Sequence, residues 1–227
     1  MATPSSTGGA PTPEQLLAAV QALPAFPLPG LVFLPHSLLP LHVFEPRYRA
    51  LVQDALASHG LLCVPMLREG WQGDYDGRPP VHPTAGFGRI VRHQALPDGR
   101  HNIILLGLGR VELEQELPAE DRPYRRFRCL LRPDRPAPAG EVERMLVEIE
   151  AMSTALVRVD PDLAGALARV AEGRPAPDAH IDLAAHLILQ DAQERQAFLE
   201  LDSLSERATL VQAALATTLA STAEIDA

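Results

Sequence analysis

The first 135 residues carry the apolar and polar pattern of short β-strands. Proline interrupts the apolar stretch 26–44 every few positions, and because proline cannot donate a ladder hydrogen bond, this stretch predicts short strands and extended turns at sheet edges. Farther on, two apolar-rich segments flank Asp98-Gly99, a dipeptide typical of hairpin turns. This half of the chain is therefore expected to be β-rich, after one short helix predicted over Pro13–Leu23.

One segment of this half changes to a helical period. Beyond Pro46 the apolar residues recur three and four positions apart, on one face of a helix: Tyr48, Leu51, Val52, Ala55 and Leu56. Pro46 suits the first helical turn, where no backbone donor is needed. Glu45 is then extended and lies beside the positive end of the helix dipole, and Gly60 ends the helix.

From Glu141 onward the pattern is helical throughout. A long apolar stripe is followed by predicted helix starts at Asp160-Pro161, Asp178, Asp191 and Ser203. The fold class expected is α+β, with a β-rich subdomain over 14–135 and a helical bundle over 141–220. Residues 1–13 have neither a basic segment nor an apolar core, so they are expected to be a disordered leader and not a signal peptide.

Composition narrows the possible chemistry. The chain has 227 residues, a formal net charge of −9 and 20 basic residues, all of them arginine. Without lysine there is no P-loop lysine, no Schiff-base amine and no Ser-Lys dyad. The acidic balance argues against nucleic acid as the main partner and fits a cytoplasmic protein without a membrane segment. Cys63 and Cys129 lie in apolar runs and are expected to be buried, reduced thiols.

The candidate chemical sites are weak. The pairs Gly86/Gly88 and Gly107/Gly109 open no helix, so they predict bulges in curved strands and not a dinucleotide site. The scattered histidines, such as His36 and His42 near Glu45, match no metal-ligand spacing. We therefore expect no catalytic residues, no metal and no cofactor. The arginines of 122–128, which alternate with Tyr124 and Phe127, are interpreted as a solvated strand face.

A family resemblance rests on the stretch Phe26–Leu56. Its Phe-Pro-Leu opening, proline-broken apolar run and Phe44-Glu45-Pro46-Arg47-Tyr48 motif resemble the N-terminal substrate-recognition (LON) domain of ATP-dependent Lon proteases. The segments Leu96–Arg100 and Gly107–Arg110, and later Leu199-Glu200 with Glu206-Arg207, resemble the same domain. The resemblance covers nearly all of 26–219 and implies a β pseudo-barrel of the PUA-like type followed by a helical bundle.

The resemblance also implies a function. It does not extend to the ATPase and protease domains of Lon, so the chain is expected to be similar to the stand-alone LON-domain proteins of bacteria. That implies a non-enzymatic module that binds unfolded or exposed peptide segments, and the partner could include a protease. The alternative is an RNA-binding protein, because PUA-like barrels often bind RNA; the net charge favours the first interpretation.

Two segments are candidates for the site. Glu45 could serve as a general base, but an ion pair with Arg47 or Arg49 at the helix terminus is the preferred interpretation, so the motif Phe44–Tyr48 is predicted to be structural. The connection 68–86 is long for a turn and carries the only tryptophan. Its candidate peptide-binding residues are Trp71, Asp74, Tyr75 and Asp76. Its acids would favour clients with basic and apolar residues, unless Trp71 folds back and plugs the end of the barrel.

Overall fold

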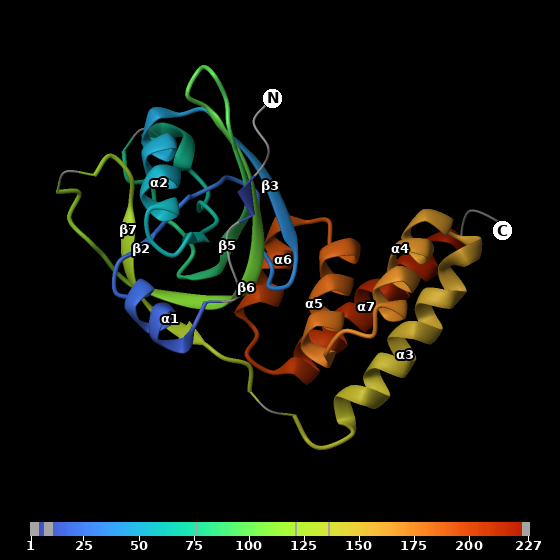
Figure 1. Ribbon diagram of the computed structural model, residues 1–227. Helices are drawn as coiled ribbons and strands as arrows, with labels where there is room; N and C mark the ends of the chain where they lie inside the picture. Colours follow the sequence, from blue (N-terminus) through green and yellow to red (C-terminus); the bar gives the residue numbers. More distant parts are fainter. Residues whose placement is uncertain (1–4, 7–10, 76, 121, 136, 224–227) are drawn as a thin grey trace. The chain divides into compact units, whose positions relative to one another are not determined.

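The computed structural model describes residues 5–6, 11–75, 77–120, 122–135 and 137–223. They divide into two compact units, Met1–Arg132 and Pro133–Ala227 (Figure 1). The first unit holds a mostly antiparallel sheet with two helices, and the second is helical. The α+β class expected from the sequence is thus confirmed. The proposed boundaries of 14–135 and 141–220 stay predictions, and most of the predicted leader lies outside the described residues, although Ser5–Ser6 forms strand β1.

The sheet of the first unit is built around its two longest strands, which form a hairpin. The strands are β1 (Ser5–Ser6), β2 (Leu23–Pro24), β3 (Leu38–Val43), β4 (Leu61–Val64), β5 (Thr84–Ala95), β6 (His101–Glu116) and β7 (Arg126–Arg132). Their hydrogen-bonded order is β1-β5-β6-β7-β2, with β3 also on β6 and β4 also on β5. The turn between β5 and β6 contains Gly99 at a φ of 78°, which confirms the Asp98-Gly99 hairpin.

The sheet curls until its two ends meet. Parallel bridges join Ala25 to Cys63 and Leu28 to Met66, so the chain after β2 pairs with β4 and its continuation. The Phe26 amide donates to the Cys63 carbonyl at 2.9 Å, and Leu28 donates to Pro65 at 3.1 Å. The strands β4, β5, β6, β7 and β2 therefore close into the expected pseudo-barrel.

Glycines in β5 and β6 let another segment cross the sheet at close range. A Cβ on Gly86 would lie 1.7 Å from the Phe33 carbonyl oxygen, and one on Gly107 would lie 2.4 Å from that of Leu34. The register of β5 against β6 shifts between Phe87 and Gly88, which confirms a bulge at these glycine pairs. The glycines are thus needed for two reasons: they let the strands curve, and they let another segment of the backbone lie directly against them.

Two helices pack on this unit. Helix α1 (Pro13–Ala19) begins at Thr12, whose side chain forms a reciprocal capping box with Gln15. It is one turn shorter than predicted, because the chain turns to place Leu23 in β2 opposite Phe127. Helix α2 (Pro46–Leu56) is found where the period predicted it. Its buried face fills the main core together with residues of β3 to β6, namely Val43, Tyr48, Leu51, Val52, Ala55, Leu62, Val64, Ile90, Ile103 and Leu105.

The second unit consists of helices that pack on one another. They are α3 (Glu141–Ala155), the short 3-10 turn η2 (Leu156–Arg158), α4 (Pro161–Glu172), α5 (Pro177–Ile188), α6 (Ala192–Glu200) and α7 (Leu204–Ala223). Helix α7 packs against α3 and α5. Asp160 and Asp191 cap α4 and α6 as predicted. The predicted cap at Asp178 is wrong: Ala176 is the N-cap of α5, since Pro177 takes the first helical position and leaves Asp178 inside the first turn.

A buried arginine links two helices of this unit through ion pairs. Arg207 of α7 is only 1% exposed, and its guanidinium contacts Asp182 of α5, itself 1% exposed, at 2.5 Å. It also pairs with Asp134 and lies over the ring of Phe198. Removing either partner of a buried pair leaves an uncompensated charge, so this contact ties α7 to α5. Among the described residues, no helix is long and apolar enough to cross a membrane.

The close crossing at Gly86 gives a stability prediction. Gly86→Ala places a methyl group against the Phe33 backbone, which cannot move without shifting the barrel, and overpacking of this kind costs about 1–3 kcal/mol. We expect a lower midpoint in chemical denaturation. Gly73→Ala is the matched control, since a Cβ there meets nothing within 4 Å. Equal midpoints for the two variants would contradict the crossing.

The histidines give a pH prediction. The Nε2 of His93 lies 3.0 Å from the Nδ1 of His101, and burial lowers the pKa of both below the ordinary value of 6.5, with mutual repulsion and Arg49 adding at His101. Burial likewise lowers the pKa of His180 and His186. The folded protein therefore holds these imidazoles neutral, whereas the unfolded chain binds protons near pH 6.5.

The sign of the effect follows from proton linkage. The free energy of unfolding is largest above pH 6.5 and falls as the pH drops from there through the lowered pKa values. Melting temperatures measured between pH 8 and pH 5, above the range where most carboxylates titrate, should decrease only in the acidic half. His101→Gln should flatten the decrease. A melting temperature that rises on acidification would contradict the assignment.

Candidate functional site

The corner between β3 and α2 is an ion-paired junction. Glu45 is the N-cap of α2, with extended backbone, but its side chain does not cap the helix. One carboxylate oxygen accepts from the Nε of Arg47 at 2.9 Å, and the other accepts from the Tyr75 hydroxyl at 2.7 Å. The predicted ion pair with Arg47 is present. The tyrosine partner was not predicted, because it comes from thirty residues away.

The connection after β4 folds onto this junction. Its 3-10 turn η1 (Trp71–Asp74) delivers Tyr75, whose carbonyl accepts from the Nη1 of Arg47 at 3.1 Å. The Arg47 guanidinium lies 4.8 Å from the centroid of the Tyr75 ring and 4.7 Å from that of Tyr48. Trp71 packs edge-on against Tyr75 with ring centroids 5.5 Å apart. The two predicted candidate segments thus form one cluster.

The predicted residues differ in exposure within this cluster. Trp71 and Tyr75 are half-buried, and Asp74 is exposed, with a carboxylate oxygen that accepts from the Arg78 amide at 3.1 Å. Asp76 lies outside the described residues. In the corner motif, Tyr48 is buried and stacks on Phe26 at 4.0 Å, whereas Phe44 is 60% exposed. The Phe44 ring stacks on that of His42, with ring centroids 6.3 Å apart. The structural role of the motif stays a prediction.

A hollow of about 250 Å³ adjoins the junction and is rich in arginine. Arg47 and Tyr48 from α2 form one part of its wall, and residues 77–78, 119 and 122–125 form the rest. Four guanidinium groups line it, those of Arg47, Arg78, Arg122 and Arg125. Arg47 and Arg78 belong to the two candidate segments of the sequence, and Arg122 and Arg125 belong to the arginine cluster 122–128.

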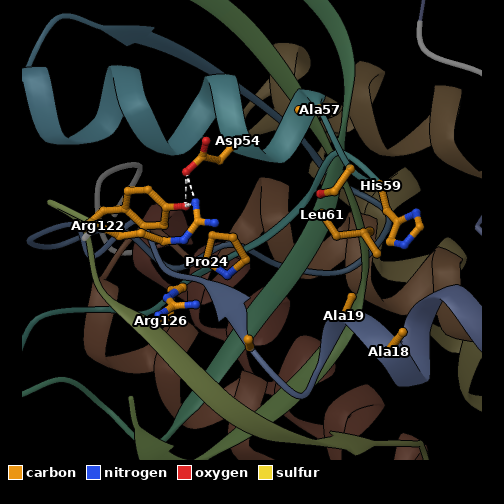
Figure 2. A pocket seen from close by; sticks show the side chains of 12 residues that line it. Ala18, Ala19, Pro24, Asp54, Ala57, His59, Leu61, Arg122 and Arg126 are labelled. Atoms are coloured by element: carbon orange, nitrogen blue, oxygen red, sulfur yellow. Dashed lines mark hydrogen bonds and ion pairs between the residues drawn. The ribbon is translucent and has the colours of Figure 1, made fainter. Parts of the chain in front are cut away.

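A second hollow of about 440 Å³ shares Arg122 and Tyr124 with the first. Figure 2 shows α2 along one wall, carrying Asp54, and the small side chains of α1 on another. Asp54 accepts from the Tyr124 hydroxyl at 2.6 Å and pairs with Arg122. The apolar lining consists of two alanines of α1, two alanines that follow α1 and α2, a proline and a leucine: Ala18, Ala19, Ala22, Ala57, Pro24 and Leu61. The two hollows are joined through Arg122 and Tyr124, and Arg47, which lines the first hollow, also donates to the Tyr75 carbonyl.

The arginines of this surface are largely paired with acids. Arg125 donates from Nε and Nη2 to the two oxygens of Glu116, at 2.9 and 2.7 Å, and Arg78 reaches the same carboxylate at 3.1 Å. Arg126 pairs with Glu120 at 2.8 Å. The side chains of Arg125 and Arg126 are only 12% and 15% exposed. The interpretation of these two arginines as part of a solvated strand face is therefore wrong, because both side chains are largely buried, although the Glu120 partner of Arg126 is exposed.

Two tyrosines of the junction and one buried thiol have raised pKa values. Burial raises the pKa of Tyr48 to about 12, and burial followed by the Glu45 hydrogen bond raises the pKa of Tyr75. Burial also raises the pKa of the Cys63 thiol, which lies next to Cys129 inside the barrel. A phenol or thiol with a raised pKa is a poor nucleophile at pH 7, so these groups suit binding and packing better than acid–base chemistry.

Comparison with known proteins places the chain in a family. Residues 22–217 match the model of the ATP-dependent protease La (LON) substrate-binding domain. This match covers most of the chain, and the chain belongs to that family. The resemblance carried by the Phe44–Tyr48 motif is confirmed.

Similar proteins and structures agree with this assignment. Lon protease 2 of Myxococcus xanthus is 28% identical over 84% of this chain and 23% of its own length. Lon protease of Methylocella silvestris is 27% identical over 95% of this chain and 26% of its own length. The chain thus spans about a quarter of these relatives. The N-terminal domain of a Mycobacterium avium complex Lon protease covers 86% of the chain with a TM-score of 0.63 at 18% identity, which shows a shared fold.

The junction gives a prediction about coupling. Tyr75→Phe and Glu45→Gln each weaken the contact between the connection and α2, and a hydrogen bond to a charged group contributes about 1.5–3 kcal/mol. A double-mutant cycle in denaturant should give a coupling free energy of that size. Glu69→Gln, an exposed acid on the same connection, combined with Tyr75→Phe is the control and should be additive. Additivity of the Glu45 and Tyr75 changes would contradict the contact.

Proposed function

We propose that this chain is a non-enzymatic recognition module for unfolded or exposed peptide segments, acting in the cytoplasm. The observation that carries the proposal is the half-buried pair Trp71 and Tyr75, which contacts Arg47 in the wall of the first of two connected hollows, on a domain of the LON substrate-binding family. Clients would be segments of other proteins, and a protease could act on them afterwards.

The surface has the features that peptide binding needs. Aromatic side chains with a polar tip provide contact area at low entropic cost, and Trp71 and Tyr75 are held in place by the Glu45 junction. The alanine-lined hollow offers space for apolar side chains of a client. The half-buried state of Trp71 fits an interface residue better than a barrel plug, since the barrel core is filled by residues of the strands and α2.

RNA binding is the weaker candidate. A nucleic-acid face presents unpaired basic side chains to the phosphate backbone, whereas the arginines of 122–126 are occupied by Asp54, Glu116 and Glu120. The net charge of −9 also argues against RNA binding.

The test uses the single tryptophan. Titration with a reduced, alkylated and therefore unfolded small protein should change the emission of Trp71, and the native form of the same protein should not. Trp71→Ala, followed by anisotropy of the labelled client, should bind about tenfold more weakly or worse, as expected for loss of an interface anchor. ATP hydrolysis and client cleavage should both be absent.

Two results would contradict the proposal. One is nucleotide-dependent turnover by the purified chain. The other is a Trp71→Ala variant with a much lower melting temperature, combined with Trp71 fluorescence in the parent protein that does not change with any client. The second result would make Trp71 a plug of the barrel.

A further inference from the structure

Strand β3 has an outer edge that no other described strand covers. Among the described residues, β3 pairs only with β6, and no further backbone group bonds to it. The Gly107 amide donates to the Ser37 carbonyl at 2.9 Å, so the alternating antiparallel ladder directs the backbone groups of Leu38, Pro40 and His42 away from β6. Pro40 fits this orientation, because a proline that faced β6 would remove a ladder bond.

The side chains along this edge are exposed and mostly apolar. Leu38 is 57% exposed, and Phe44, directly after the strand, is 60% exposed. Pro40 and His42 between them are also exposed, and the stacking of Phe44 on His42 keeps all four side chains on one face. An uncovered sheet edge with exposed apolar side chains is a template for pairing with another strand.

This edge also lacks the charged side chains that commonly protect such edges from pairing. Residues 1–44 contain one charged side chain, Glu14, which lies in α1. A hollow of about 530 Å³ on β3, β5 and β6 is lined by Arg92 and by no acid. Two copies of a chain with a net charge of −9 repel each other, so a contact between them needs a face without acids, and the β3 edge provides one.

We propose that the outer edge of β3 pairs antiparallel with the same edge of a second copy of this chain. The result is a symmetric dimer in which one sheet runs through both copies. This interaction goes beyond the proposed function and does not depend on it, because Trp71 and the two hollows beside α2 are not part of the β3 edge.

Pro40 determines the register of the two strands. If Pro40 lay opposite Pro40 of the second copy, neither residue could donate, and both hydrogen bonds of that pair would be lost. A twofold axis at Leu41 instead places Pro40 opposite His42 of the second copy, whose N–H can donate to the Pro40 carbonyl. The same axis places Leu38 opposite Phe44, so the two exposed apolar side chains at the ends of the edge cover each other.

The remaining register is excluded by burial. An axis at Leu39 would place Phe44 opposite Leu34, which is buried and lies outside β3. The axis at Leu41 is therefore the one that pairs every exposed side chain of the edge. One strand from each copy makes a small contact, so the dimer is expected to dissociate on dilution.

Sedimentation velocity tests the dimer directly. A concentration series up to about 0.5 mM should show a reversible monomer–dimer equilibrium. The double variant Leu38→Glu/Phe44→Glu should dissociate about a hundredfold more readily or worse, because the symmetry places like charges opposite each other twice. The matched control is Leu130→Glu/Val157→Glu, which adds the same charge at residues that are 54% and 58% exposed and should dimerise like the parent. Melting curves verify that both variants fold.

Charge reversal tests the register. Leu38→Arg/Phe44→Arg should also be monomeric by itself. An equimolar mixture with Leu38→Glu/Phe44→Glu should form a heterodimer, because each glutamate then lies opposite an arginine of the other chain. The same arginine variant mixed with the control Leu130→Glu/Val157→Glu should stay monomeric.

Three results would overturn the inference. They are a parent chain that stays monomeric throughout the series, a dimer that persists in Leu38→Glu/Phe44→Glu, and a mixture of the two charge variants that fails to associate. Amide hydrogen exchange at Leu38 and His42 adds a fourth outcome. Protection that appears on addition of an unfolded polypeptide, and not with rising concentration of the chain, would assign the edge to clients and leave the proposed function standing.

Discussion

The carboxylate of Glu45 is the contact on which the candidate surface depends. It accepts from Arg47 on its own helix and from Tyr75 on the connection after β4, so a strand-to-helix corner and a distant loop become one structure. Arg47 completes the junction by donating to the Tyr75 carbonyl. Trp71, packed on Tyr75, is linked to the junction through these contacts.

The barrel provides the rigid base for this junction. Gly86 and Gly107 allow the segment that contains Phe33 and Leu34 to lie directly on the β5–β6 hairpin. That segment leads into β3 and then to the corner at Glu45. Because the bulge at the glycine pairs bends the hairpin, the sheet can close between Ala25 and Cys63 and still expose the connection that carries Trp71. Backbone geometry and site position are therefore linked.

The sequence predicted local features well and distant contacts poorly. The helix after Pro46, the Asp98-Gly99 turn and the caps at Asp160 and Asp191 depend on neighbouring residues, and all are present. The bond from Tyr75 to Glu45 and the convergence of Arg78 with Arg125 on Glu116 join residues far apart in sequence. No spacing rule predicts such contacts. The arginines of 122–128 were identified as a cluster, but their acidic partners depend on the closure of the barrel.

Peptide photo-crosslinking tests the central claim most directly. An unfolded peptide with a photoreactive residue would be bound to the full chain and irradiated, and the attachment sites would be mapped by mass spectrometry. If the corner and the connection form the binding surface, crosslinks should map to Trp71–Tyr75 and to the residues that line the two hollows. Both groups of crosslinks should be lost in Glu45→Gln. Crosslinks confined to the helical unit 133–227, or unchanged in that variant, would contradict it.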